Sequence, residues 1–174
     1  MLDSLTDWKD HADPGVRYFS GTATYHKTFT CSRPAGCSRV WLDLGEVQNM
    51  AQVTLNGHPC GILWHAPFSV DVTGALRDGE NELEIRVTNL WVNRMIGDEF
   101  EPDDVAWGEP SRYGYAPGNP IIGSTMKEIP EWLEKGLPRP SQGRHAVISY
   151  KFFSKDAPLH PSGLLGPIAL TAGY

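Results

Sequence analysis

The chain has 174 residues, of which 40% are hydrophobic and 21% are charged, proportions that are typical of a globular domain with one core. The formal net charge is −6 and the basic residues do not cluster, which excludes nucleic-acid binding because that needs grouped Lys and Arg. No apolar run approaches the roughly 20 residues that cross a bilayer, so a membrane partner is not expected either. The 18 Gly and 14 Pro favour many short strands joined by turns.

The first 17 residues are polar and acidic and show no alternation. We interpret residues 1–17 as a linker or N-terminal extension, and residues 18–174 as one domain. The first strand is predicted at Ala23–Thr30, where Tyr25, Lys27 and Phe29 alternate with polar residues, the period-2 pattern of a half-buried strand.

A second strand is predicted at Arg39–Val47, followed by a hairpin over Ala51–Trp64. Asn56-Gly57 supplies the positive φ angles that a tight hairpin turn requires. Two further strands are expected at Phe68–Leu76 and Arg77–Leu90, since both alternate apolar and polar residues.

The end of the hairpin places Trp64 and His65 just before Pro67. A residue before proline is held extended, so the alternation is expected to continue to His65. Ile62 and Trp64 then share one face of the strand, and we predict that both pack into the core while His65 points outward.

Residues 93–143 break the strand pattern and are rich in Gly, Pro and acidic residues. A long irregular segment in a compact domain is usually a functional loop, and we treat this one as an insertion with a short helix inside Met126–Gly136. Alternation returns at His145–Phe153, and a last strand is predicted at the C-terminus. The chain is therefore predicted to be all-β: a jelly-roll β-sandwich with one long irregular insertion.

The cysteines, Cys31, Cys37 and Cys60, are odd in number, so they do not all pair within one chain. A Cys31–Cys37 bridge and three free thiols both remain open. The absence of a CxxC pair excludes a zinc site of the usual spacing.

Three stretches carry a resemblance to a known family. YFSGTATYHKTF, LDLGEV and VTLNGHPCGILWHAPFSVDVTGALRDGENELEIRVTNL are similar to the sugar-binding β-sandwich domain of family 2 glycoside hydrolases, the β-galactosidase type. LWVNRMIGDE, KEIPEWLEKGLPRP and PLHPSGLLGPIAL also resemble the module near the C-terminus of family 106 α-L-rhamnosidases. The resemblance covers the chain from about Tyr18 onward.

The resemblance implies a galactose-binding-like jelly roll that accompanies a catalytic domain elsewhere in the same parent chain. It implies a bacterial, secreted or periplasmic parent that acts on a plant or bacterial polysaccharide or oligosaccharide. The leading hypothesis is thus a non-catalytic accessory domain of a larger glycoside hydrolase, an α-L-rhamnosidase or a β-galactosidase-like enzyme. A free-standing carbohydrate-binding module and a structural or adhesion domain without a sugar site are the alternatives.

We predict no catalytic residues and no cofactor in this chain. Glycoside hydrolysis needs two facing carboxyl groups, one of them with a raised pKa, whereas the acidic residues here crowd into one loop that is expected to be solvated. A structural calcium is the alternative use of that loop, because Ca²⁺ takes oxygen ligands. The residues concerned are Asp98, Glu99, Glu101, Asp103 and Asp104.

Sugar rings stack on aromatic side chains, and their hydroxyls bind Asn, Asp and Arg. The segment that follows the predicted strand Arg77–Leu90 concentrates such groups, so we predict a carbohydrate contact there together with the outward histidine. Its alternative is structural, with Trp91 covering the core and Arg94 paired with Asp98 or Glu99. The predicted residues are His65, Trp91, Asn93, Arg94, Asp98 and Glu99.

Overall fold

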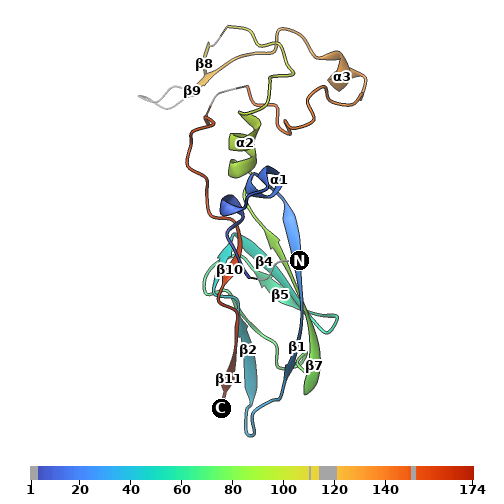
Figure 1. The fold of residues 1–174 in the computed structure, drawn as a ribbon, viewed down its shortest axis with the longest axis vertical. Coiled ribbons are helices and arrows are strands. Elements are labelled where there is room, and N and C mark those ends of the chain that lie inside the picture. Colours follow the sequence, from blue (N-terminus) through green and yellow to red (C-terminus); the bar gives the residue numbers. More distant parts are fainter. Residues whose placement is uncertain (1–3, 110, 114–120, 150–151) are drawn as a thin grey trace. The chain divides into compact units, whose positions relative to one another are not determined.

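The computed structural model describes residues 4–109, 111–113, 121–149 and 152–174, and it divides the chain into two compact units (Figure 1). Unit 1 comprises residues 1–91 and 160–174, and unit 2 comprises residues 92–159. Unit 2 therefore covers the predicted insertion and extends beyond it. No helix among the described residues is long and apolar enough to cross a membrane.

Unit 1 is a sandwich of antiparallel sheets, which confirms the all-β prediction. The larger sheet has the strand order β1-β7-β4-β5, and its inward side chains are the alternate apolar residues that the sequence pattern indicates. For example, Ala51, Val53 and Leu55 are buried while the residues between them are not. The strands are β1 (Thr22–Cys31), β4 (Met50–Leu55), β5 (His58–Leu63) and β7 (Gly79–Thr88).

The facing layer contains a three-stranded sheet, β11-β2-β6, and a strand pair, β10-β3. The predicted strand Arg39–Val47 is in fact two strands, because the chain turns at Gly45, whose φ is 65°. A Cβ at Gly45 would lie 2.4 Å from the backbone of Gly166, so only glycine fits there. The strands are β2 (Arg39–Asp43), β3 (Glu46–Gln48), β6 (Ser69–Asp71), β10 (Gly163–Gly166) and β11 (Ala169–Gly173).

The predicted Asn-Gly turn between β4 and β5 is confirmed, with φ angles of 53° at Asn56 and 78° at Gly57. The Asn56 side chain also ties the turn to β7: its amide donates to Asn81 Oδ1 at 2.7 Å, and its oxygen accepts from the Glu82 N–H at 3.0 Å. Asn81 is completely buried and accepts from the Arg77 N–H at 2.9 Å. The turn is thus held by side-chain hydrogen bonds as well as by its glycine.

The segment that we interpret as a linker is part of the sandwich unit. It forms a short 3-10 helix, η1 (Trp8–Asp10), and one helical turn, α1 (Pro14–Arg17). Trp8 is only 5% exposed, and its indole N–H donates to the Tyr25 hydroxyl at 2.7 Å. The sequence predicts a linker or N-terminal extension here, but one buried tryptophan fixes this segment against β1 and β10.

The prediction that Ile62 and Trp64 pack into the core is wrong. Ile62 is 59% exposed and Trp64 is 71% exposed. The cause is a β-bulge: Val53 pairs with Gly61 while Thr54 pairs with Pro59, so Cys60 is the extra residue. The bulge shifts the alternation by one position, and Leu63 rather than Ile62 stands opposite the buried Ala51.

Unit 2 contains little regular structure. Its elements are the helix α2 (Val92–Asp98), the strand pair β8 (Ser111–Tyr113) and β9 (Ile121–Gly123), and the helical turn α3 (Glu131–Glu134). The predicted helical content near Pro130 is confirmed as α3, whereas α2 falls where only an irregular loop is predicted. The cysteines are all free thiols in this structure, and burial raises the pKa of Cys60.

The strand that we predict at His145–Phe153 is absent from its described part, residues 145–149 and 152–153; residues 150–151 lie outside the described residues. The N–H groups of His145 and Ala146 both donate to the carboxylate of Asp98. Successive N–H groups of a strand point in opposite directions, so this backbone conformation is incompatible with a ladder.

Candidate functional site

Four of the six predicted sugar-contact residues lie on or beside α2 in unit 2. Asp98 is completely buried and Asn93 is 1% exposed. Arg94 donates from Nε to Asp98 Oδ1 at 2.8 Å, which is the structural alternative to a sugar contact by these two residues. Glu99, which follows the helix, is half-buried. The burial of Asn93 and Asp98 does not support a direct sugar contact by either side chain.

Asp98 is the centre of a hydrogen-bond network rather than a surface ligand. Besides the guanidinium of Arg94, it accepts the N–H of His145 at 3.1 Å and the N–H of Ala146 at 2.6 Å. These donors come from 47 and 48 residues further along the chain. Asp98 therefore joins α2 to a segment of unit 2 that is distant in the sequence.

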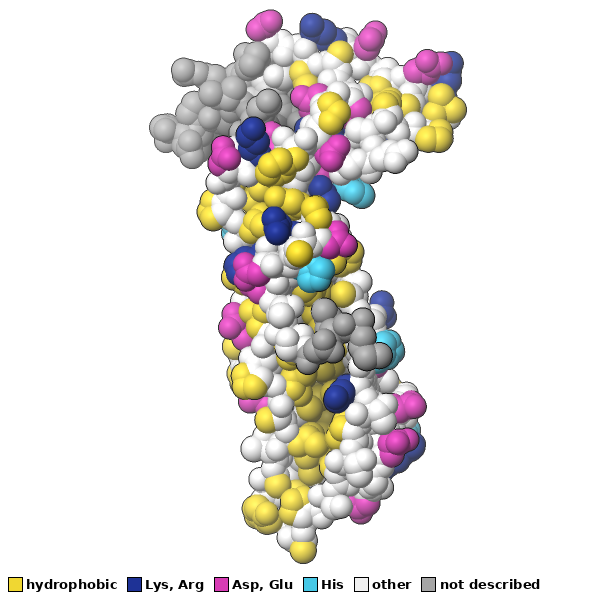
Figure 2. Space-filling view, in the orientation of Figure 1, with side chains coloured by type: hydrophobic (Ala, Val, Ile, Leu, Met, Phe, Trp, Pro, Cys, Tyr) yellow, Lys and Arg dark blue, Asp and Glu magenta, His cyan; other side chains and the backbone are white. Residues whose placement is uncertain are grey.

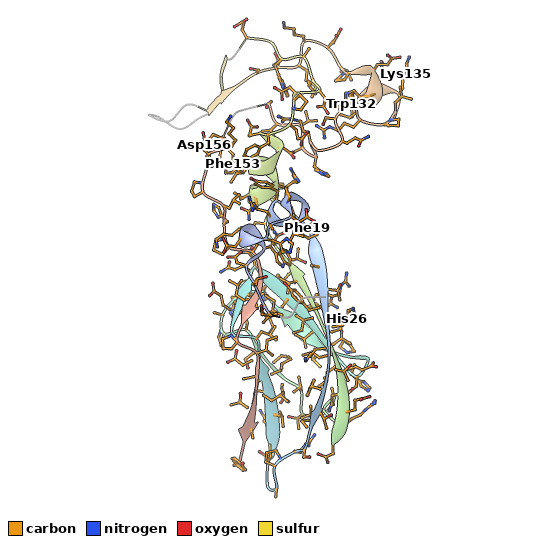
Figure 3. The ribbon with its side chains drawn as sticks, viewed as in Figure 1. Phe19, His26, Trp132, Lys135, Phe153 and Asp156 are labelled. Carbon is orange, nitrogen blue, oxygen red and sulfur yellow. The ribbon has the colours of Figure 1, made fainter. Side chains whose placement is uncertain are left out.

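Two further carboxylates of the acidic loop are also paired with arginines. Asp104 binds Arg139 through two hydrogen bonds, and Arg144 Nη2 lies 3.2 Å from Asp103 Oδ1. Arg139 in addition stands over the ring of Trp132, with its guanidinium carbon 5.3 Å from the ring centroid. Trp132 projects from α3, as Figure 3 shows. The sequence predicts a solvated acidic loop, but the structure pairs Asp98, Asp103 and Asp104 with arginines.

The arginine pairs also bear on the calcium alternative and on catalysis. Within the described residues, no group of three or more His, Cys, Asp or Glu side chains is arranged to hold a metal ion. The hydrogen bond from Arg139 holds the pKa of Asp104 below its usual 3.8. A general acid of glycoside hydrolysis needs the opposite shift, so Asp104 is suited to an ion pair and not to proton donation.

Asp104→Asn is expected to destabilise unit 2 by about 1–3 kcal/mol at pH 7, because it leaves the Arg139 guanidinium short of an acceptor. The folded state lowers the pKa of Asp104, so the stabilisation is complete above the unfolded value near 3.8 and disappears as the pH falls through the folded value. Urea unfolding of both proteins between pH 7 and pH 2 measures this effect. The difference between them should be constant above about pH 5 and shrink as the pH falls; a difference that is as large at the acid end as at pH 7 would contradict the assignment.

Exposed apolar residues at the end of β5 and the start of β4 form the second candidate site, which lies in unit 1. Ile62 of β5 lies on the outer face of the larger sheet, and Met50 of β4, 40% exposed, lies on the same face. Trp64 directly follows β5 and is also exposed. We call Met50, Ile62 and Trp64 the β5 patch. The rest of this face is polar, and Figure 3 shows His26 pointing away from the sandwich at the opposite edge. Its polar members are Thr24, His26, Thr28, Glu82, Glu84 and Arg86.

The two remaining predicted residues, His65 and Trp91, are both exposed in unit 1. The His65 ring meets the Trp64 ring edge to face, with centroids 4.7 Å apart, and its Nδ1 lies 2.8 Å from the Ala66 carbonyl oxygen. Trp91 is 72% exposed, so it does not cover the core as the structural alternative proposes. Sequence reasoning missed Met50 and Ile62, since only the bulge at Cys60 turns Ile62 outward.

The strands of unit 1 thus form an all-β sandwich that carries an exposed apolar patch on the outer face of its larger sheet. Residues 8–114 match the family described as the galactose-binding domain-like domain of glycosyl hydrolase 2. The chain belongs to this family.

Two longer proteins resemble almost the whole chain. A Formosa agariphila protein named "Putative beta-glucuronidase" is 42% identical over 171 residues, which cover 97% of this chain and 13% of that protein. The solved structure of a rhamnosidase from Novosphingobium sp. PP1Y is 37% identical, with a TM-score of 0.67, over 97% of this chain and 12% of that one. The chain thus spans about an eighth of the length of these relatives. The family match and the similarity to the rhamnosidase structure confirm the resemblance described from the sequence.

Proposed function

We propose that the chain is a non-catalytic accessory β-sandwich of a larger glycoside hydrolase and that it braces the catalytic domain of the same polypeptide. The similarity to about an eighth of two long proteins that are named as glycosidases supports this proposal. The rhamnosidase relative favours an α-L-rhamnosidase as the parent. The buried and arginine-paired carboxylates of unit 2 support a non-catalytic role.

The observation that carries the proposal is the β5 patch. A domain that is stable alone rarely gathers large apolar side chains on an otherwise polar sheet face, and such patches usually mark an interaction surface. Trp64 is the largest member and is 71% exposed. Exposed tryptophans that become buried in an interface commonly contribute about 2 kcal/mol or more to binding. We propose that the catalytic domain covers this patch.

Trp64→Ala is expected to be silent in the isolated chain and harmful in the parent enzyme. In the isolated chain the unfolding free energy should change by less than about 0.5 kcal/mol, as for other exposed positions. In the parent, the half-life of activity on 4-nitrophenyl α-L-rhamnopyranoside at elevated temperature should fall. Thr28→Ala, on the same sheet face at the β1 edge, is the matched control. Equal behaviour of the two variants in the parent would contradict the proposal.

A carbohydrate contact is the second candidate function, favoured by the exposed Trp64–His65 pair. An exposed indole face stacks on sugar C–H groups, and the neighbouring imidazole is able to bind a hydroxyl. Calorimetric titration with L-rhamnose, galactose and a pectin-derived oligosaccharide tests this candidate. Binding between about −8 and −4 kcal/mol that is lost in Trp64→Ala would support it. Trp91→Ala tests the tryptophan that the sequence predicts as a sugar contact.

A further inference from the structure

An apolar groove of about 760 Å³ runs along unit 1 between the two facing sheets. Figure 2 shows the hydrophobic stripe that follows it down the sandwich. One wall comes from β1 and β7, and the other comes from β2, β10 and β11. The residues that define these walls include Tyr25, Phe29, Leu42, Ile85, Leu164 and Leu170.

The strand register shows that the groove is uncovered core and not an ordinary surface hollow. Leu170 of β11 pairs with Leu42 of β2, which in turn pairs with Val70 of β6, so the three lie on one inward face. Leu42 is 3% exposed and Val70 is 9% exposed, yet Leu170 is 37% exposed. Among the described strands β11 has only β2 beside it. Leu170 is therefore exposed because, among the described strands, its sheet ends at β11 beside the groove.

The two strands that border the groove differ in how well their free edges are protected. On β1, Lys27 lies at an inward position of the alternation, paired with the buried Leu83, and an inward charge on an edge strand discourages pairing with another strand. On β11 the sequence is Ala-Leu-Thr-Ala-Gly, without charge or proline. An uncharged free edge beside an apolar groove is a template for strand addition.

We propose that an extended segment of the parent polypeptide, preceding this chain, adds to the free edge of β11 and packs alternate apolar side chains into the groove. The inference rests on the proposed function, because it requires a longer parent. The occupant is a strand, since the exposed outer edge of β11 offers a backbone ladder and the groove beside it takes alternate apolar side chains. Ser4 and Leu5 line the same groove as Ala169 and Leu170 of β11, so the first described residues and β11 border one surface.

Hydrogen exchange of the β11 amides tests the proposal. We would compare the 174-residue chain alone with the same chain inside the full parent. The amides that point away from β2 should exchange at least about 100-fold more slowly in the parent, because they gain partners there. The β11 amides that point toward β2 are the internal control and should be protected in both proteins.

A pair of substitutions on the same strand provides a second measurement. Leu170→Lys places a charge in the groove, whereas Thr171→Lys places the same charge on the opposite face, beside the exposed Trp41. In the parent, Leu170→Lys should lower the Tm more than Thr171→Lys does. In the isolated chain the two shifts should be similar and small, since the groove is open there.

Equal exchange of the outward β11 amides in both proteins would overturn the proposal, as would equal Tm shifts of the two variants in the parent. Protection that is already present in the isolated chain, together with a dimer in sedimentation, would also overturn it in favour of a second copy. Failure of the proposed function would instead appear as equal half-lives of activity for the Trp64→Ala and Thr28→Ala variants of the parent. That test concerns the outer face of the larger sheet and not the groove. The two proposals therefore fail separately.

Discussion

Asp98→Ala is expected to destabilise unit 2 by about 3–5 kcal/mol, the usual loss when one partner of a buried charge pair is removed. The substitution leaves the Arg94 guanidinium without its acceptor at 2.8 Å. It also frees the N–H groups of His145 and Ala146, which Asp98 binds at 3.1 and 2.6 Å. Hydrogen exchange of α2 and of residues 144–146 in increasing urea measures the loss.

Asp103→Ala is the matched control for this prediction. It removes an acidic residue from the same loop, but its side chain is 43% exposed and forms an ion pair with Arg144. Arg144 also donates to the carbonyl oxygens of Glu101 and Pro102, which Asp103→Ala leaves in place. An ion pair with one exposed partner contributes about 0–1 kcal/mol, so the control should be nearly neutral. If Asp98→Ala costs no more than Asp103→Ala, the network around Asp98 does not hold unit 2 together.

Trp8→Ala is expected to destabilise unit 1 by about 3–5 kcal/mol, as large-to-small substitutions of buried tryptophans do. The indole packs edge to face on Phe19, with ring centroids 5.5 Å apart, and binds the Tyr25 hydroxyl. Trp8→Phe keeps most of the packing and loses the hydrogen bond, so a smaller loss of about 1–2 kcal/mol is expected. Urea denaturation followed by hydrogen exchange of β1 and β7 measures both.

Trp91→Ala is the control for Trp8, because it removes the same side chain from an exposed position of the same unit. Its unfolding free energy should stay within about 0.5 kcal/mol of the wild type. Similar values for Trp8→Ala and Trp91→Ala would restore the interpretation of residues 1–17 as a linker.

Local pattern was sufficient to predict most of the sandwich. The ten residues of β7 alternate so regularly that the period alone identifies their inward face. The turn at Asn56-Gly57 followed from the small set of residues that tolerate a positive φ. These features are local, because side-chain period and turn chemistry involve only neighbouring residues.

The misassigned residues depended on partners that are distant in the sequence. Trp8 gives no periodic signal, and its burial requires Tyr25 and the β10 backbone around Gly163. Asp98 looks like any acidic loop residue until the chain brings His145 and Ala146 to it. The segment at 145–149 has the alternation of a strand, but alternation does not form a ladder when another acceptor takes the N–H groups.

The sequence by itself thus determined the all-β class, the positions of the main strands along the chain and the hairpin turn, since these follow from local periodicity and backbone sterics. The tertiary structure decided which residues face outward, because one extra residue at Cys60 inverts the alternation of β5. It also decided that the acidic loop is held by arginines, and that the core is open beside β11. These features depend on strand register and on contacts between distant segments, which no local pattern encodes.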